Sequence, residues 1–290
     1  SEKTDLWFRS LDKDEKKRLG IASVGVAAVM AIVLFCLPVP QVAIETDNLA
    51  LASMTVFGQC TESDLLDDDN LQWIGSAFVY QRNGDLLYMY TNAHCLGLDA
   101  LVQYAAMEID GSIEISGFHL SVGFPSGEVR PVKRMAIDVT GKDIARLEVS
   151  ASRLVEGKDY VVIPFAGSTH HLGVKPGDDV IAVGSPIDPE LQGTQTFGHV
   201  SALRPENQSL WIQHDAPISH GNSGGPLFLK RGKKLHWVGI NTKGNFRGHS
   251  LGFALSCQDA VEGDYLWADA TPAGAASVFT NFGISATVVE

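Results

Sequence analysis

Cysteine and positive charge are both scarce in this sequence, and each shortage argues against a class of protein. The 290 residues include 4 Cys and no Cys-x-x-Cys pair, which excludes a disulfide-rich scaffold and argues against structural zinc. Lys and Arg total 22 against 34 Asp and Glu, a net charge of −12, which argues against a general nucleic-acid binder. What remains is a folded globular chain, 45% hydrophobic, for which we expect no metal and no cofactor.

One long hydrophobic run, residues 19–38, stands apart near the N-terminus. It reads LGIASVGVAAVMAIVLFCLP, and no charged residue lies between Arg18 and Glu45. At about 1.5 Å per residue, the run is long enough to cross roughly 30 Å of hydrocarbon. Basic residues before it and acidic residues after it orient the N-terminus inward. The sequence thus predicts a cytoplasmic tail at 1–18, a transmembrane helix with a short linker at 19–44, and an outward domain at 45–290.

A cleaved signal peptide or a lipoprotein signal is the alternative to an uncleaved anchor. Neither fits well, because the small residues of a cleavage site are missing before Glu45, and Phe35 before Cys36 is too large for a lipobox. We therefore expect a single-pass protein that contacts a bacterial inner membrane through residues 19–38 and carries its outward domain in the periplasm.

Beyond residue 49, the sequence changes to short runs of β-branched and aromatic residues separated by turn signals. Many short strands at regular spacing are typical of β-barrels and sandwiches. Asn83-Gly84 and Asp110-Gly111 predict two-residue hairpin turns. The predicted strands are Met54–Cys60, Trp73–Gln81, Leu86–Tyr90, Ile113–Val122, Val132–Val139, Ile144–Val149, Tyr160–Pro164, Val180–Val183, Leu210–Gln213 and Leu235–Asn241.

The most specific segment is Gly221-Asn222-Ser223-Gly224-Gly225-Pro226. Glycines on both sides let the backbone approach a substrate closely, so that N–H groups can point at a developing oxyanion beside the Ser223 hydroxyl. An ordinary glycine-rich turn is the plain alternative. The letters also satisfy Gly-x-Ser-x-Gly, the nucleophile elbow, but that motif needs a helix after the serine and its acid and histidine downstream. Here strand-like residues follow, so the elbow interpretation fails.

Upstream of Ser223, a histidine and an aspartate occur in the order typical of another class of peptidase. His94 follows the predicted strand Leu86–Tyr90, and Asp143 directly precedes the predicted strand Ile144–Val149. Singly, His94 suits a half-buried core histidine and Asp143 a turn residue after Gly141. Together with Ser223 they follow the order His, Asp, Ser.

These segments resemble the trypsin/chymotrypsin fold family and, within it, the HtrA/Deg branch. The likeness runs from about residue 54 to 260. It is carried by Gly75-Ser76-Ala77-Phe78, Thr91-Asn92-Ala93-His94, Asp143-Ile144-Ala145-Arg146-Leu147, Val183-Gly184-Ser185-Pro186, Gly198-His199-Val200-Ser201-Ala202, Ile212–Ile218, Gly221–Pro226, Gly239-Ile240-Asn241-Thr242 and Gly252-Phe253-Ala254-Leu255.

The resemblance implies an all-β protein of two perpendicular six-stranded antiparallel barrels, the first at about 50–150 and the second at about 151–270. In that fold Ser223 is the nucleophile, His94 the general base and Asp143 the residue that holds the imidazole tautomer. The backbone N–H groups of Gly221 and Ser223 would form the oxyanion hole.

The resemblance also implies a substrate pocket and a disulfide. The pocket residues would be Pro217, Ile218, Asn241, Thr242, Gly252, Phe253 and Ala254. No carboxylate lies in that set, so small or medium apolar side chains are expected at P1, the substrate residue before the cleaved bond; His214 and His220 could instead favour an acidic one. Trypsin-like enzymes often have a disulfide beside the catalytic histidine, and we expect Cys60 to pair with Cys95.

HtrA-type proteins usually carry a PDZ domain after the protease, but only 20 residues follow Ala270, so none is expected in this chain. A homotrimer or a partner in a membrane complex rests on family analogy alone. The sequence thus predicts a membrane-anchored serine endopeptidase that cleaves misfolded or signalling proteins outside the cytoplasm. The alternative is a non-catalytic scaffold or accessory subunit of a membrane complex.

Overall fold

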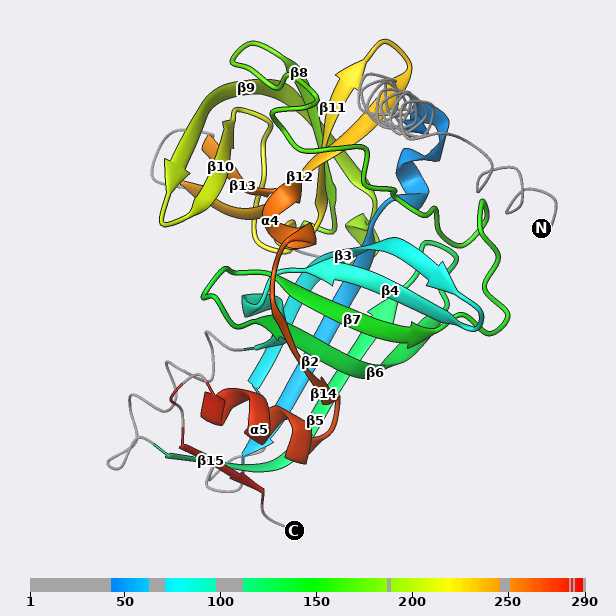
Figure 1. Cartoon of the computed structure of the whole chain (residues 1–290). Helices are drawn as coiled ribbons and strands as arrows, with labels where there is room; N and C mark the ends of the chain where they lie inside the picture. The colour runs from blue at the N-terminus through cyan, green and yellow to red at the C-terminus, as the bar shows by residue number, and fades with distance from the viewer. Residues whose placement is uncertain are drawn as a thin grey trace, which may run out of the picture. The chain divides into compact units, whose positions relative to one another are not determined.

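The described part of the chain folds into two β-barrels. The computed structural model describes residues 43–62, 71–97, 112–186, 189–245, 251–281, 283 and 285–288, and Val42–Glu290 forms one compact unit. Within it, two six-stranded antiparallel sheets each close on themselves, which confirms the predicted chymotrypsin-like, all-β architecture (Figure 1).

The first barrel is built from β2 to β7. Its strands follow the order β6-β7-β4-β3-β2-β5, and pairing of β5 with β6 closes it. Alternate residues of β5 are buried, as expected for a strand with one face on a core. The strands are β2 Met54–Glu62, β3 Leu71–Asn83, β4 Leu86–Thr91, β5 Ser112–Gly123, β6 Val129–Asp138 and β7 Ala145–Ser150.

The second barrel is built from β8 to β13. Its order is β12-β11-β8-β9-β10-β13, closed by pairing of β12 with β13. The short β1, Ile44–Glu45, adds to β12. The other strands are β8 Asp179–Gly184, β9 Thr194–Glu206, β10 Ser209–His214, β11 Pro226–Arg231, β12 Lys234–Asn245 and β13 Leu251–Ser256.

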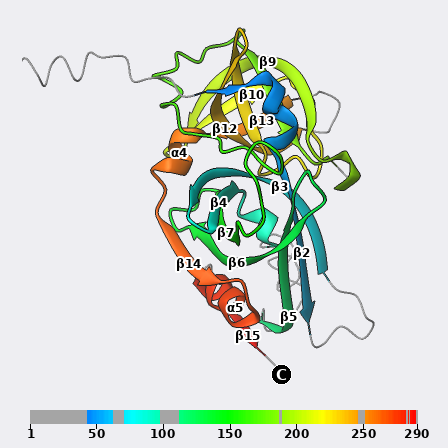
Figure 2. The ribbon, with the colours of Figure 1, turned by 90° about the vertical axis from the view of Figure 1, so that its right-hand side faces the viewer.

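The C-terminal segment returns to the first barrel. After α4, Cys257–Val261, strand β14, Tyr265–Asp269, pairs antiparallel with β6. Helix α5, Pro272–Asn281, buries Phe279 and other apolar side chains in the core of that barrel, and β15, Ser285–Val288, then pairs parallel with β5. Figure 2 shows β14, α5 and β15 running along one side of the first barrel.

Two local predictions differ from the structure. Asn83 pairs with Leu86, so the hairpin turn is Gly84-Asp85, one residue later than predicted; Gly84 has a φ of +57°, which suits the first position of a type II′ turn. The run Tyr160–Pro164 is not a strand. Its apolar residues enter the cores as an extended connection between the barrels, bonded through Val161 N–H to Leu51 O. The predicted Asp110-Gly111 turn lies outside the described residues.

Three short 3₁₀ helices complete the described elements: η1 Thr46–Leu51, η2 His94–Leu96 and η3 Pro189–Leu191. The predicted Cys60–Cys95 disulfide is wrong, because Cys95 is a buried free thiol whose Sγ donates to the carbonyl oxygen of Ser223 at 3.4 Å. The structure thus places the cysteine beside His94 against the second barrel instead of against Cys60.

The predicted localisation, a single-pass inner-membrane protein with a periplasmic domain, is corrected. Within the residues that the structure describes, no helix has the length and apolar character needed to cross a bilayer. The tail at 1–18 and the span at 19–38 lie outside those residues. The localisation is therefore withdrawn.

Three apolar clusters hold the unit together, one inside each barrel and one between them. In the cluster between the barrels, Phe78 and Tyr90 of the first barrel contact Trp237 of the second, with ring centroids 5.1 and 5.4 Å apart. Such large side chains contribute most of the buried area of a core. They therefore fix the separation of the two barrels, on which the site below depends.

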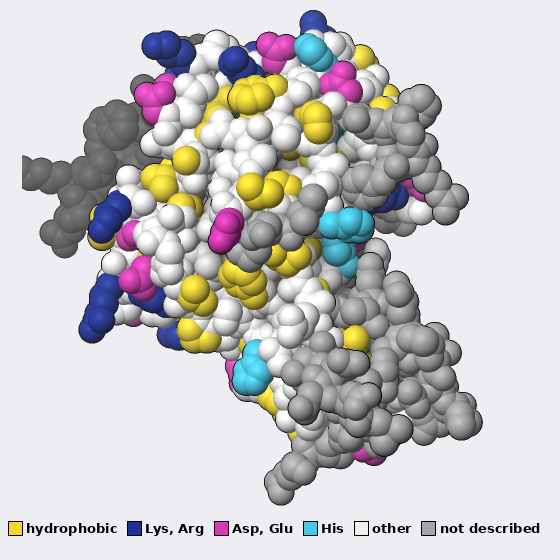
Figure 3. Space-filling model, turned by 180° about the vertical axis from the view of Figure 1, so that it is seen from behind, with side chains coloured by type: hydrophobic (Ala, Val, Ile, Leu, Met, Phe, Trp, Pro, Cys, Tyr) yellow, Lys and Arg dark blue, Asp and Glu magenta, His cyan; other side chains and the backbone are white. Residues whose placement is uncertain are grey.

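The face seen from behind the view of Figure 1 shows hydrophobic side chains at the surface of both barrels, with polar atoms between them (Figure 3). Phe197 on β9 is 62% exposed and Val129 on β6 is 54% exposed. Isolated exposed apolar residues are ordinary on folded proteins. The polar cleft between the barrels is the more informative surface.

Candidate active site

His94 and Asp143 lie together because of how β4 and β7 pair. Thr91, the last residue of β4, is opposite Ala145, the first residue of β7. Residues just after β4 and just before β7 therefore emerge at the same end of the barrel. Asp143 Oδ2 lies 2.7 Å from His94 Nδ1, and Asp143 Oδ1 accepts a bond from the His94 backbone N–H at 3.0 Å. Both side chains are partly exposed, at 25% and 31%.

Asn92 ties this pair to the second barrel. Its side-chain amide donates to the carbonyl oxygen of Asp143 at 2.6 Å and to Thr242 Oγ1 at 3.0 Å. Thr242 Oγ1 in turn donates to Ile240 O. Because Asn92 is fully buried, these bonds are shielded from water and fix the loop that carries Asp143.

The protonation of His94 is set by its neighbours. Burial lowers the pKa of His94, whereas its neighbours Cys95 and Asp143 raise it, and the net pKa lies above the ordinary value of 6.5. A carboxylate at Nδ1 favours the tautomer whose free nitrogen is Nε2.

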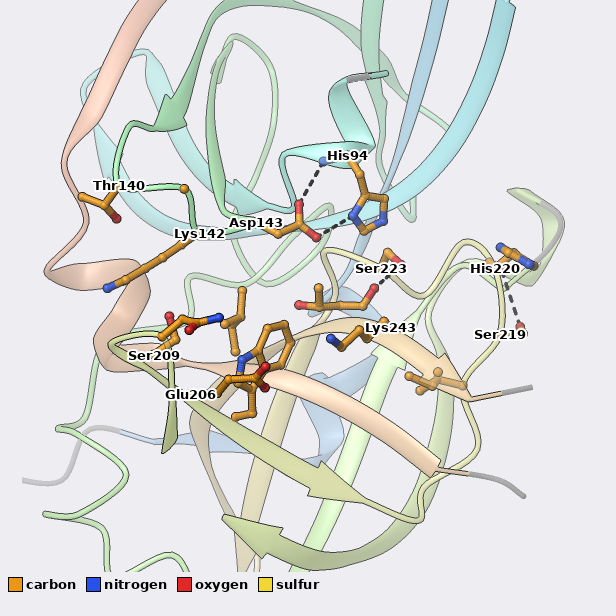
Figure 4. Close-up of a pocket in the computed structure, with 17 residues that line it drawn as sticks. His94, Thr140, Lys142, Asp143, Glu206, Ser209, Ser219, His220, Ser223 and Lys243 are labelled. Atoms are coloured by element: carbon orange, nitrogen blue, oxygen red, sulfur yellow. Dashed lines mark hydrogen bonds and ion pairs between the residues drawn. The ribbon is translucent and has the colours of Figure 1, made fainter. Parts of the chain in front are cut away.

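Ser223 enters the same cleft from the second barrel, on the turn before β11. Its Oγ donates to Thr242 O at 3.0 Å, with no hydrogen bond to His94 (Figure 4). The turn is held by backbone pairing with β12: Gly224 N–H donates to Asn241 O, and Asn241 N–H donates to Gly225 O. Ser223 thus faces the His94 side of the cleft, with its hydroxyl turned to its own barrel.

Gly221 lies in a tight turn just before Ser223. Asn222 N–H donates to Ser219 O at 3.1 Å, which closes a four-residue turn. Gly221 is the third residue of that turn and has a φ of +91°. Positive φ at that position defines a type II turn and favours glycine.

Ser76 of the first barrel anchors this turn. Its N–H donates to Ser223 O at 2.7 Å and its Oγ to Gly221 O at 2.6 Å. The same Oγ accepts from Ser185 N–H at 2.9 Å. Both carbonyl oxygens of the turn are thus held by the first barrel.

The predicted pocket residues divide between the surface of the cleft and the interior. The cleft, of about 660 Å³, is lined by Ile218 and Thr242 from that set. Asn241 and Ala254 are fully buried, and Pro217 is exposed outside the cleft lining. Gly252 lies against the ring of His214 and Phe253 is half-buried, so neither lines the cleft.

The two histidines considered for an acidic P1 residue differ. His220 lines the cleft, whereas His214 is fully buried, and burial lowers its pKa to about 4. His214 is therefore neutral at physiological pH and offers no charge to a substrate.

Sequence reasoning missed several charged and aromatic residues that line the cleft. Lys142 and Lys243 line it together with Glu206 and Trp211. The position of Lys142 next to Asp143 in the sequence could have indicated its place in the cleft. Lys243 lies after a β-bulge at Thr242, which no sequence pattern predicts. Within the described ranges, no group of three His, Cys, Asp or Glu residues is arranged to hold a metal.

Two closed barrels, with a histidine and a carboxylate from the first and a serine from the second, define the class of trypsin-like peptidases. A family model of the trypsin-like peptidase domain matches residues 75–240, and the chain belongs to this family. Among similar proteins are the serine protease Do-like HtrB of Bacillus subtilis (strain 168), 30% identical over 198 residues, and the serine protease HTRA3 of Mus musculus, 35% identical over 177 residues. Both relatives are named serine proteases of the HtrA type, which agrees with the predicted class of serine peptidase.

The alignments are partial. They cover 63% and 58% of this chain, and 36% and 32% of those two relatives. Among solved structures, a variant of the HtrA-type protease AlgW with a decapeptide matches with a TM-score of 0.51 and 22% identity, over 74% of this chain and 63% of the other. This last likeness supports the fold.

Proposed function

We propose that the chain cleaves misfolded or signalling proteins by a Ser-His-Asp acyl-enzyme mechanism. The observation that carries the proposal is the 2.7 Å contact between His94 Nδ1 and Asp143 Oδ2 in the cleft that Ser223 also lines. An imidazole with Nδ1 bound to a carboxylate leaves Nε2 free to accept a proton. The relatives are named serine proteases, and the similar AlgW variant was solved with a decapeptide.

In this mechanism, Ser223 Oγ turns from Thr242 O towards His94 and attacks the peptide carbonyl. His94 Nε2 takes the hydroxyl proton and delivers it to the leaving amine, while Asp143 stabilises the imidazolium. The developing oxyanion accepts bonds from the N–H groups of Gly221 and Ser223, each worth about 10²–10³ in rate. In the second half of the reaction, His94 takes a proton from water, the water attacks the acyl carbonyl, and Ser223 Oγ leaves with the proton from His94.

Substrate preference follows from the pocket wall. Ile218 and Thr242 support small or medium apolar residues at P1, and Pro217, Asn241, Gly252, Phe253 and Ala254 would shape the pocket from behind or beside it. A homotrimer is part of the proposal by analogy with the family and is tested by light scattering of the purified chain.

One observation favours a second candidate, a non-catalytic scaffold or accessory subunit. Ser223 Oγ is bonded to Thr242 O at 3.0 Å, and a hydroxyl held there does not attack. The two candidates differ in whether the serine ever reaches the histidine.

The test uses the full chain with a fluorophosphonate probe and unfolded casein. We expect covalent labelling of Ser223, casein cleavage, and loss of both in Ser223→Ala. Ser116→Ala, an exposed serine on the first barrel, should behave as the unmodified chain. A chain that neither labels nor cleaves would refute catalysis and favour the scaffold.

A further inference from the structure

Lys243 places a positive charge in the cleft beside Ser223. A β-bulge between Asn241 and Lys243 interrupts the pairing of β12 with β13, and bulges next to active sites commonly re-aim a side chain. Lys243 follows Thr242, whose carbonyl oxygen accepts the Ser223 hydroxyl bond. Figure 4 shows Lys243 within the cleft, on the second-barrel side below Asp143.

The ammonium group of Lys243 is supported by aromatic rings. Its Nζ lies 4.3 Å from the ring centroid of Trp211 and 5.9 Å from that of Phe253. Cation–π contact holds such a group in place without neutralising it. Among the described residues, no carboxylate lies within 4.0 Å of this Nζ, whereas Lys142, the other lysine of the cleft, is paired with Asp259 Oδ1 at 2.9 Å.

Neither acidic side chain of the described cleft lining, Asp143 or Glu206, forms an ion pair with Lys243. Asp143 is occupied by His94 at 2.7 Å. Glu206, at the β9 end of the cleft, also lines it but makes no ion pair with Lys243 in the described part. Of the two lysines in the described cleft lining, Lys243 is thus the one that no carboxylate pairs, and it lies in the same cleft as Ser223.

We infer that Lys243 selects an acidic side chain at a substrate position close to the cleaved bond. This inference rests on the proposed function, since it names the substrate class of the same site. A substrate carboxylate would accept a charge-assisted hydrogen bond from Nζ while Trp211 holds the lysine stem, and the apolar P1 wall would remain as proposed. A preference of roughly tenfold is expected, since charge-assisted bonds contribute about 1.5 kcal/mol or more.

The plain alternative is that Lys243 only covers Trp211. Lys243→Met separates the two roles, because methionine keeps an unbranched apolar stem over the ring and lacks the charge. Lys233→Met is the matched control: Lys233 is exposed in the turn between β11 and β12, outside the cleft, so its loss changes net charge equally.

The experiment measures binding and turnover separately on the full chain. The peptides are acetylated and amidated, and they differ only by Glu, Gln or Lys at one of the three positions on either side of an apolar P1. Their binding to the Ser223→Ala chain is measured by fluorescence anisotropy. The kcat/KM values of the same peptides are measured with active Ser223. We expect at least one position where Glu binds roughly tenfold better than Gln, with that gap abolished by Lys243→Met, kept by Lys233→Met, and inverted towards lysine-containing peptides by Lys243→Glu.

Two results overturn the inference: equal binding of Glu and Gln peptides at every position, which includes no measurable binding, or a Glu preference that survives Lys243→Met. The proposed function fails separately. Ser223-dependent turnover without an acidic preference refutes the role of Lys243 alone, while a Lys243-dependent binding preference without any Ser223-dependent turnover refutes catalysis alone. Raising the ionic strength should shrink the preference if it is electrostatic.

Discussion

The two barrels contribute residues to the cleft that differ in their hydrogen bonding. In the first barrel, His94 and Asp143 are joined at 2.7 Å by residues that flank directly paired strands. In the second, Ser223 Oγ is bonded to its own strand at Thr242 O. The His94–Asp143 pair is therefore assembled within one barrel, whereas the position of the proposed nucleophile, Ser223, depends on how the second barrel docks against the first.

Docking is mediated by a few buried polar residues of the first barrel. Ser76 bonds the carbonyls of both Gly221 and Ser223, and Asn92 bonds Thr242. Buried hydrogen bonds of this kind are costly when left unmade. The comparison predicts large catalytic effects from changes within the first barrel's pair, and effects on both stability and activity from changes at the contact between barrels.

The largest expected effect comes from breaking the pair inside the first barrel with Asp143→Asn. An asparagine amide donates to Nδ1, so the proton of the neutral imidazole moves to Nε2 and the base is lost; the expected fall in kcat is about 10⁴-fold. Asp143 also raises the pKa of His94. Since the neutral imidazole is the active form, removing the carboxylate should shift the acid limb of the pH–rate profile to lower pH.

Casein cleavage and pH–rate profiles with a peptide substrate check this prediction, and circular dichroism should show an unchanged fold. Asp269→Asn, at the exposed end of β14, is the matched control and should retain full activity. An Asp143→Asn chain with unchanged kcat would mean that His94 and Asp143 do not act in catalysis.

The next effect tests the contact between the barrels through Gly224→Ala. A Cβ at Gly224 would lie 2.0 Å from Ser76 O and 2.4 Å from Thr91 Oγ1, and its φ is +87°. Backbone strain of about 1–2 kcal/mol and overpacking of about 1–3 kcal/mol should both lower the free energy of unfolding. Activity should fall as Ser223 is displaced.

Gly232→Ala isolates the strain from the clash. Gly232 has a φ of +64° and nothing within 4 Å of a built Cβ, so only the cost of about 1–2 kcal/mol remains. Urea unfolding of both variants measures the difference. Equal losses in the two variants would show that the close approach of Gly224 to Ser76 is not important.

A smaller effect is expected from Ser76→Ala, which removes one cross-barrel hydroxyl. Gly221 O and Ser185 N–H would each lose a buried partner, at a cost of about 1–3 kcal/mol in unfolding free energy. Because the Gly221 turn loosens, kcat should fall more than KM rises. Ser116→Ala, whose Oγ donates to Thr61 O at the surface, should change neither quantity; a kcat unaffected by Ser76→Ala would place the turn's support elsewhere.

The barrel strands were largely predictable, because one buried face leaves an alternating pattern such as that of β5. Strand β9 was not, since only Val200 among its residues is buried and its position comes from backbone pairing with β8 and β10. The segment Tyr160–Pro164 was wrongly predicted to be a strand for the opposite reason: it is apolar, but it does not pair with a strand of either barrel. The return of β14 and β15 to the first barrel depends on contacts between residues far apart in sequence, which no local pattern records.

The site shows the same division. Short motifs singled out His94, Asp143 and Ser223, and the structure brings all three to one cleft. The contacts that support them were not visible, because they join residues of different barrels. Lys243 over Trp211 requires the bulge at Thr242, and Cys95 faces Ser223 O where the motif suggested a disulfide.

The smallest expected effect compares two ion pairs, one that links the barrels and one at the outer surface. Asp259 Oδ1 contacts Lys142 Nζ at 2.9 Å and its Oδ2 accepts from Leu210 N–H at 3.0 Å, so it connects the residue before Asp143 to β10. Its side chain is only 9% exposed. Asp259→Asn keeps an acceptor for Leu210 but removes the charge, and we expect a loss of about 1 kcal/mol in unfolding free energy.

Asp269→Asn is the matched comparison, since Asp269 lies 3.9 Å from Arg134 with both side chains well exposed, and such pairs contribute only a few tenths of a kcal/mol. Urea unfolding at low and high salt separates the two, and kcat should fall slightly in Asp259→Asn alone because Lys142 adjoins Asp143. If the surface substitution costs as much as the other, position between the barrels does not strengthen an ion pair here. The support of Asp143 would then come from the Asn92 amide at its carbonyl oxygen and not from Asp259.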